Sequence, residues 1–164
     1  MAVGKIAMDR STYFDTYWGP GWPDEKWLAR YFLTAKGRHD FFSSGNDSWG
    51  LTAEGIDGTD HLPNLKGRLD VDLLIQGHRD LGVLLQWRKT GRVPIQTYYS
   101  KGDVTRLRQW VKDVRGYLLP VGLFIPFETA WKAIKEFMDR DAALPQSIEW
   151  IKSSDLPPGT FPPP

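Results

Sequence analysis

The sequence predicts a single α+β domain in which an antiparallel β-meander packs against two to three helices. Three consecutive stretches of alternating apolar and polar residues predict the meander, and one long amphipathic stretch in the last third of the chain predicts the principal helix. The chain has 164 residues, the length of one ordinary domain, and 41% of them are hydrophobic, which suffices for one core. We expect this domain to cover residues 1–152 and the proline-rich residues 153–164 to form an extended tail.

The composition excludes several classes of protein. The absence of cysteine removes disulfide bonds, thiolate zinc sites and cysteine nucleophiles. The longest apolar run, residues 117–127, is interrupted by proline and glycine and falls short of the roughly 20 residues that a membrane-spanning helix requires. The first ten residues lack the apolar core of a secretory signal. We therefore expect a soluble cytoplasmic protein that works without a metal, a cofactor or a membrane partner.

The amino-terminal part is predicted to combine an irregular segment with one helix. The first 22 residues are aromatic and rich in turn formers, with no clear period, and we expect them to wrap over the core. A helix is predicted from Asp24, because apolar residues such as Trp27 and Tyr31 recur at helical spacing. We expect Gly37 to end this helix.

The middle of the chain is predicted to hold the sheet. Turn formers in residues 38–66 indicate loops around short strand pieces at residues 41–42 and 49–52. Beyond them, apolar and polar residues alternate in three runs with short polar connections, which is typical of hairpins with one face in the core. The predicted strands are residues 69–76, 81–88 and 93–99.

The carboxyl-terminal part is predicted to add two helices and a strand. Asp103 is a candidate cap for a helix with an apolar stripe that ends at Gly116. Residues 118–125 predict a strand or a tight connection. Residues 126–139 carry apolar side chains at i, i+3, i+4 and i+7, so this helix is the most strongly patterned element. Residues 147–151 predict a strand that returns beside the sheet.

Charge is segregated along the chain, although the net charge is only +1. Residues 40–80 contain eight acids and three bases, whereas residues 86–115 contain eight bases and two acids. This asymmetry indicates a charged partner for at least one segment, or two segments that face and neutralise each other.

The acidic segment supplies the candidate contact residues. An aromatic anchor, Trp49, lies in a turn-rich stretch among carboxylates, an arrangement suited to a basic protein surface. The alternative is that the loop charges are solvated and Trp49 points inward. We call the candidate residues the acidic set, and they are Asp47, Trp49, Glu54, Asp57, Asp60, Asp70, Asp72 and Asp80.

The basic segment permits a second interpretation, a nucleic-acid-binding module. Residues 86–115 interleave cations with Trp87, Tyr98, Tyr99 and Trp110, and such rings can stack on bases while the cations contact phosphates. Periodicity places Trp87, Tyr99 and Trp110 on apolar faces, however, which favours packing in the core.

A hydrolase is a third interpretation. His39 and His61 lie near Asp40, Asp57 and Asp60 in the sequence, and a histidine with a carboxylate partner is a workable general base. The spacing of these residues matches no metal-binding signature, such as two histidines one helical turn apart. We therefore expect no catalytic residue and no enzymatic activity.

The last third of the chain resembles a known family. Ile-Pro-Phe-Glu-Thr-Ala-Trp-Lys-Ala-Ile-Lys-Glu-Phe at residues 125–137, Leu-Pro at residues 144–145 and Ile-Glu-Trp at residues 148–150 resemble the closing signature of the Imm1 family of bacterial immunity proteins. The resemblance implies an α+β protein that binds a toxin of a polymorphic toxin system and silences it inside the producing cell. The toxins paired with this family are often nucleic-acid deaminases or nucleases.

The resemblance implies a partner but no contact residue, because the matched residues lie mostly on predicted core faces. We expect a cognate toxin domain as the partner, occlusion of its active site as the mechanism, and no direct contact with nucleic acid. A nucleic-acid-processing toxin carries a basic cleft, so the acidic set is the expected contact surface.

Overall fold

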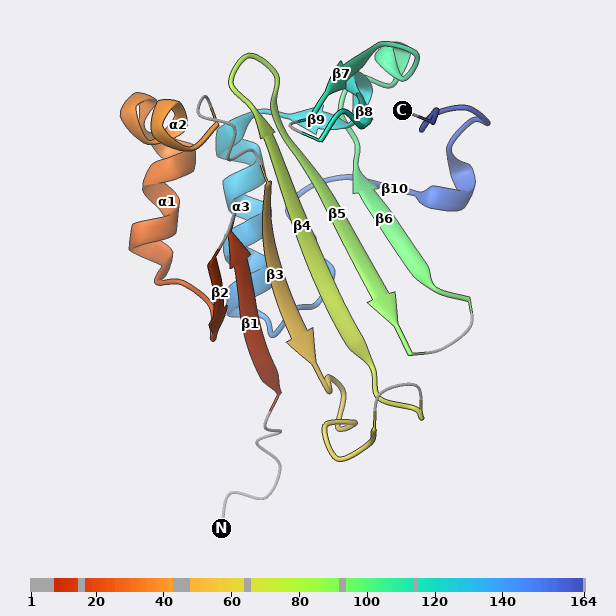
Figure 1. Ribbon diagram of the computed structural model, residues 1–164. Helices are drawn as coiled ribbons and strands as arrows, with labels where there is room; N and C mark the ends of the chain where they lie inside the picture. Colours follow the sequence, from red (N-terminus) through yellow and green to blue (C-terminus); the bar gives the residue numbers. More distant parts are fainter. Residues whose placement is uncertain are drawn as a thin grey trace.

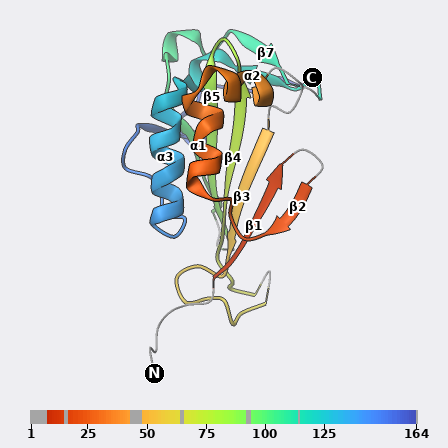
Figure 2. The ribbon, with the colours of Figure 1, turned by 90° about the vertical axis from the view of Figure 1, so that its left-hand side faces the viewer.

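The computed structural model describes residues 8–14, 17–42, 48–63, 66–91, 94–113 and 115–163. Within them, eight strands form one antiparallel sheet and three α-helices cover one of its faces, which confirms the α+β class (Figures 1 and 2). The strand order is β10-β6-β5-β4-β3-β1-β2, and β9 pairs with β5. The strands are β1 (Asp9–Phe14), β2 (Tyr17–Pro20), β3 (Ser48–Glu54), β4 (Asp70–His78), β5 (Gly82–Thr90), β6 (Gln96–Ser100), β9 (Phe124–Ile125) and β10 (Trp150–Lys152).

The predicted meander is confirmed as β4, β5 and β6. The register of β4 and β5 runs from Asp70 opposite Thr90 to a tight turn with His78 opposite Gly82. Gly82 has a φ of 103°, and a Cβ there would lie 2.0 Å from a backbone oxygen of β9, so this turn requires glycine. The third strand begins later than predicted. Pro94 has no N–H to donate to a ladder, and Ile95, which follows it, is 57% exposed.

Two helices, not one, follow the amino-terminal strands. Thr34 has an extended backbone that ends α1, and its hydroxyl accepts a hydrogen bond from the Gly37 N–H, which caps α2. Gly37 therefore lies inside α2, where a Cβ would lie 2.0 Å from the Arg30 carbonyl oxygen. The strand piece predicted at residues 41–42 belongs to this helix. The helices are α1 (Glu25–Leu33), α2 (Ala35–Phe42) and α3 (Phe127–Asp139).

The main core lies between the helices and the sheet, and α3 is its centre. The prediction of a helix at residues 126–139 is confirmed, with Ala130, Ile134 and Phe137 fully buried. The Trp131 ring stacks on Phe32 of α1 with 5.7 Å between centroids. This packing joins two helices that are distant in the sequence.

The first 22 residues contain strands, contrary to the expectation of an irregular wrap. β1 pairs with β3 and with β2, so this hairpin extends the sheet at one edge. The Trp22 indole N–H then donates to the Thr52 carbonyl oxygen and fixes the chain against β3. Polar residues dominate β1, which explains why its period is not visible in the sequence.

The helix predicted from Asp103 to Gly116 is wrong. Asp103 does act as a cap, because its carboxylate accepts the Thr105 N–H, but the helix is a single 3₁₀ turn. The Asp113 carboxylate then accepts the N–H groups of Arg115 and Tyr117 and folds the chain into a β-hairpin. The elements of this part are η1 (Val104–Arg106), β7 (Trp110–Lys112), β8 (Leu118–Pro120) and η2 (Val121–Leu123).

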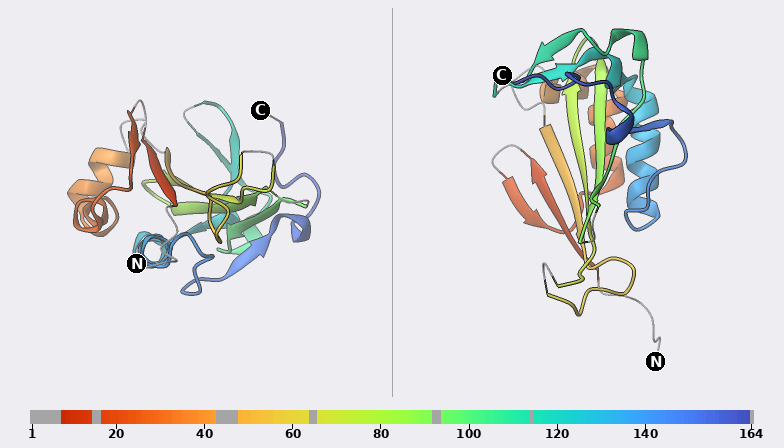
Figure 3. Two further views of the ribbon diagram at one scale, coloured as in Figure 1. Left: turned by 90° about the horizontal axis from the view of Figure 1, so that it is seen from below. Right: turned by 90° about the vertical axis from the view of Figure 1, so that its right-hand side faces the viewer.

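The β7–β8 hairpin covers one end of the sheet face opposite the helices (Figures 1 and 3). A second hydrophobic cluster forms there, in which Leu84 of β5 packs with Leu107, Leu119 and Leu123. One face of the sheet is therefore covered by three helices, whereas the other is covered by the hairpin only at one end.

The stretch after β10 is less extended than predicted. It begins with a 3₁₀ helix, η3 (Ser153–Asp155), and Thr160 is buried. The Trp110 indole N–H donates to the Thr160 carbonyl oxygen, and the Phe161 ring lies 5.0 Å from that of Tyr99. These contacts hold the proline-rich segment against β6 and β7.

Candidate partner-binding surface

The candidate site is the part of the sheet that neither the helices nor the β7–β8 hairpin covers, which we call the open face. Side chains alternate across each strand, so Thr52 of β3, Asp72 of β4, and Gln86 and Arg88 of β5 point away from the helices. The β1–β2 hairpin flanks this face on one side, and the β7–β8 hairpin lies at its upper end (Figures 1 and 3).

A hollow of about 320 Å³ lies in the open face over the three central strands. The Asp72 carboxylate lines it, and its Oδ1 accepts the Thr52 hydroxyl at 2.9 Å. Oδ2 lies 3.7 Å from an Arg88 nitrogen, which is too long for a hydrogen bond. The hollow is lined by Gly50, Leu51, Thr52, Asp72, Leu73, Leu74, Gln86 and Arg88.

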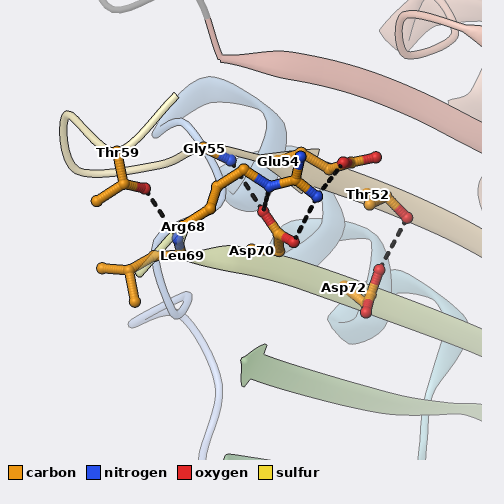
Figure 4. A network of polar contacts seen from close by, with 8 residues as sticks. All are labelled: Thr52, Glu54, Gly55, Thr59, Arg68, Leu69, Asp70 and Asp72. Carbon is orange, nitrogen blue, oxygen red and sulfur yellow. Dashed lines mark hydrogen bonds and ion pairs between the residues drawn. The ribbon is translucent and has the colours of Figure 1, made fainter. Parts of the chain in front are cut away.

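A network around Arg68 joins the end of β3 to the start of β4 at one edge of the open face, and Figure 4 shows its contacts. The Arg68 guanidinium donates to both oxygens of Asp70, at 3.0 and 3.1 Å, and lies 2.6 Å from Glu54. The bidentate bond to Asp70 raises the pKa of Arg68 further above its usual range. Asp70 also accepts the Gly55 N–H at 3.0 Å, so this carboxylate fixes the turn after β3.

The acidic and basic segments neutralise each other in part, as one of the two interpretations predicted. The register of β4 and β5 places Asp72 opposite Arg88, and Lys89 of β5 forms a 3.0 Å ion pair with Asp57. The other cations of the basic segment lie in and around the β7–β8 hairpin. Four of its cations form no ion pair with any described residue, and they are Lys101, Arg106, Arg108 and Lys112.

The structure separates the acidic set into several environments. Glu54, Asp70 and Asp72 lie together on the open face, whereas Asp57 and Asp60 belong to the loop beyond β3. Asp80 lies in the β4–β5 turn, at the opposite end of the strand from this loop (Figure 1). Asp47 is outside the described residues.

Trp49 is not available as a surface anchor, which corrects that expectation. Its side chain is 1% exposed because β3 directs it toward the helices, where it packs against Trp27, Tyr31 and Phe41. The alternative interpretation, in which Trp49 points inward, is confirmed. Trp49 is therefore part of a strand that packs in the core, although turn formers flank it in the sequence.

The rings of the basic segment serve packing. Trp87 is buried and donates its indole N–H to the Ala142 carbonyl oxygen, and the Tyr98 ring lies 5.9 Å from it. Tyr99 lies beneath Phe161 on the opposite side of the sheet, and burial raises the pKa of its hydroxyl. The prediction that these rings pack, and do not form a stacking platform, is confirmed for Trp87.

A second cavity, of about 440 Å³, lies beside β2 and the start of α1. Its walls are mostly apolar, and sequence reasoning did not identify it because its residues come from four separate elements. The Arg10 guanidinium covers the Trp22 ring at 5.0 Å. The cavity is lined by Thr12, Pro20, Gly21, Trp22, Pro23, Trp27 and Trp49.

Two further kinds of feature that would bear on function are a metal-binding cluster and a membrane-spanning helix. Across the part of the chain that the structure describes, no group of three or more His, Asp or Glu side chains is placed to hold a metal ion. His39 and His61 are exposed. Among the same residues, no helix has the length and apolar character needed to cross a bilayer.

No protein-family model, curated protein or solved structure matches this chain.

Proposed function

We propose that this chain is a cytoplasmic immunity protein that binds a cognate toxin domain, a nucleic-acid deaminase or nuclease, and silences it by occluding its active site. The observation that carries the proposal is the Imm1-like signature of residues 125–150. In the proposed role the chain performs no reaction of its own, and its activity depends on shape and charge complementarity.

The place of the signature in the fold supports this role. Its residues form β9, α3 and the start of β10, and they include the buried Phe127, Trp131 and Phe137. α3 packs against the centre of the sheet, so the signature forms the support beneath the open face. A rigid support keeps the side chains of a contact surface in place before the partner arrives, which lowers the entropic cost of binding.

The chemistry of the open face also supports this role. Glu54, Asp70 and Asp72 give it more acids than the two bases, Arg68 and Arg88, so it complements the basic cleft of a nucleic-acid-processing enzyme. Asp60, in the loop beside it, adds negative charge that steers such a partner toward this side, whereas the charge of Asp57 is balanced by its ion pair with Lys89. Asp80 lies in the turn beyond the other end of β4, so it would contact a different part of the partner.

Co-expression with the toxin domain encoded beside this chain tests the proposal. We expect cells to survive expression of the toxin only when the chain is present, and the two proteins to purify as a stoichiometric complex without toxin activity. Survival should fall with a variant whose core is strongly destabilised, such as Trp131→Ala. Persistent toxicity, or protection without a complex, contradicts the proposal.

A nucleic-acid-binding module remains the second candidate, because Lys101, Arg106, Arg108 and Lys112 are exposed and outside any ion pair with described residues. This candidate predicts a gel shift that weakens steeply with salt and is reduced by Arg106→Ala and Arg108→Ala. An immunity protein predicts no such shift at physiological salt.

A further inference from the structure

We infer that the hollow in the open face is a receptor for one basic side chain of the toxin, with an arginine guanidinium as the best fit. The inference rests on the proposed function and adds to it the location and the chemistry of one contact. It follows from three features of the hollow, namely an acceptor in its lining that makes no hydrogen bond to another described residue, a shape set by a glycine, and the local balance of charge.

The unused acceptor is Oδ2 of Asp72. Its companion oxygen, Oδ1, accepts the Thr52 hydroxyl at 2.9 Å, which fixes the orientation of the carboxylate. Oδ2 accepts no hydrogen bond from any described residue, and the nearest cation, Arg88, is 3.7 Å away. A carboxylate held in this way can bind an incoming cation without first breaking a hydrogen bond to another side chain.

The shape of the hollow depends on Gly50. On either side of it, Trp49 and Leu51 turn toward the helices, so a side chain at residue 50 would project over the open face. The nearest heavy atom to a Cβ added there is Cβ of Tyr13, at the ordinary contact distance of 3.7 Å. Glycine is therefore not required by the backbone at this position, and its absent side chain leaves room for a ligand.

The walls of the hollow suit the aliphatic stem and the planar head of arginine. Leu74 is half-buried beside Asp72 and offers an apolar surface for the methylenes. The Gln86 side chain lies opposite Leu74 in the strand register and lines the same hollow, and its amide group can act as a hydrogen-bond acceptor. A guanidinium can donate to two such acceptors at once, whereas an ammonium group has no matching planar fork.

The charges around the hollow favour a cation over an anion. Arg68 is held by Glu54 and Asp70 and cannot turn to Asp72 without losing its bidentate bond. Arg88 is 47% exposed and forms no hydrogen bond to Asp72, so it can move into solvent when another cation arrives.

Titration calorimetry of the full chain with a catalytically inactive toxin domain tests the inference. Asp72→Asn keeps the shape and the bond from Thr52 but removes the charge, and we expect at least about tenfold weaker binding. Gly50→Leu fills the hollow and is expected to weaken binding to a similar degree. Arg88→Gln removes a positive charge that competes with the arginine of the toxin for Asp72, so binding should tighten a few-fold.

Asp24→Asn is the matched control, because it makes the same change of charge at the exposed start of α1, on the helix-covered side of the sheet. We expect its affinity to stay within about twofold of the parent. Thermal melting of each variant verifies folding, and if Gly50→Leu is unfolded, the isosteric Asp72→Asn decides alone.

The outcomes separate the inference from the function on which it rests. Tight binding by the parent with an unchanged affinity of Asp72→Asn overturns the inference and leaves the proposed function standing. A loss of affinity in Arg88→Gln equal to that in Asp72→Asn also overturns it, because the toxin would then recognise the pair and not the acceptor. Absence of a complex with the parent chain overturns both.

Discussion

The two faces of the central sheet are built from the same strands but hold their side chains in opposite ways. On β4, Val71, Leu73 and Ile75 are fully buried against the helices. Asp70 and Asp72, which alternate with them, lie on the open face in contact with polar partners. The comparison shows how alternation lets one strand serve two purposes. Apolar burial on one face stabilises the fold, and the polar face is left to interact with a partner.

The two faces of the sheet also contribute differently to the free energy of unfolding. Burial of large side chains contributes several kcal/mol per residue, whereas partly exposed ion pairs typically contribute about 0–1 kcal/mol. We therefore expect substitutions on the helix-covered face to lower stability and most substitutions on the open face to lower affinity. Three predictions test this division, beginning with the largest effect.

Trp131→Ala should lower the free energy of unfolding by about 3–5 kcal/mol, because it leaves a cavity between α3 and Phe32 of α1. Urea unfolding followed by circular dichroism measures this loss. Lys132→Ala, one residue along the same helix and exposed, should change stability by no more than about 0.5 kcal/mol. Equal losses in the two variants would show that α3 does not pack as described.

Asp70→Asn should lower the free energy of unfolding by about 1–3 kcal/mol, although it lies on the open face. Its carboxylate is only 16% exposed and holds both Arg68 and the backbone of Gly55. Asp72→Asn, in the same strand, should cost less than about 0.5 kcal/mol because Asp72 is 40% exposed. Together the two variants distinguish a carboxylate that stabilises a turn, Asp70, from one that is available to a partner, Asp72. A larger loss for Asp72→Asn would contradict that assignment.

Glu136 gives a smaller effect that depends on pH. Its carboxylate accepts the N–H groups of Gln146 at 2.6 Å and Ser147 at 3.0 Å, and the bond from Gln146 is the main cause of a lowered pKa. A lowered pKa in the folded state means that the stabilisation is present above the ordinary glutamate pKa of about 4.3. It is lost as the pH falls through the lower folded-state value.

The variant Glu136→Gln should therefore be less stable than the parent at pH 7, by no more than about 1 kcal/mol because the carboxylate is partly solvated. This difference should shrink as the pH is lowered through the acid range, when measured by urea unfolding at a series of pH values. A difference that stays constant with pH would mean that the charge of Glu136 does not stabilise the connection between α3 and β10.

Strong local periodicity explains the parts of the fold that could be predicted. The alternation in β4 and β5 and the apolar stripe of α3 are visible in a single sequence. Thr34 separates α1 from α2 through a hydrogen bond to Gly37 that the sequence pattern does not distinguish from a continuous helix. The apolar spacing that predicted a helix near Trp110 is also compatible with the hairpin that Asp113 closes.

The candidate site could be predicted only in part, because it depends on strand register. The charge segregation indicated that acids and bases would interact, but the pairing of Asp72 with Arg88 follows from which residues of β4 and β5 lie opposite each other. The hollow depends on Gly50, whose role requires knowledge of its neighbours on β1 and β4. Trp49 was assigned to the surface because the strand that buries it is short and flanked by turn formers.

Two neighbouring leucines provide the most direct test of the division between the faces. Leu73 is fully buried on the helix-covered face, and Leu74 lies on the open face beside the hollow. In a cross-saturation NMR experiment on the complex with the inactive toxin domain, saturation of the toxin protons should reach the methyl groups of Leu74 and leave those of Leu73 unaffected. Saturation of Leu33, which is 48% exposed on α1, with none at Leu74 would place the partner on the helices and contradict the account.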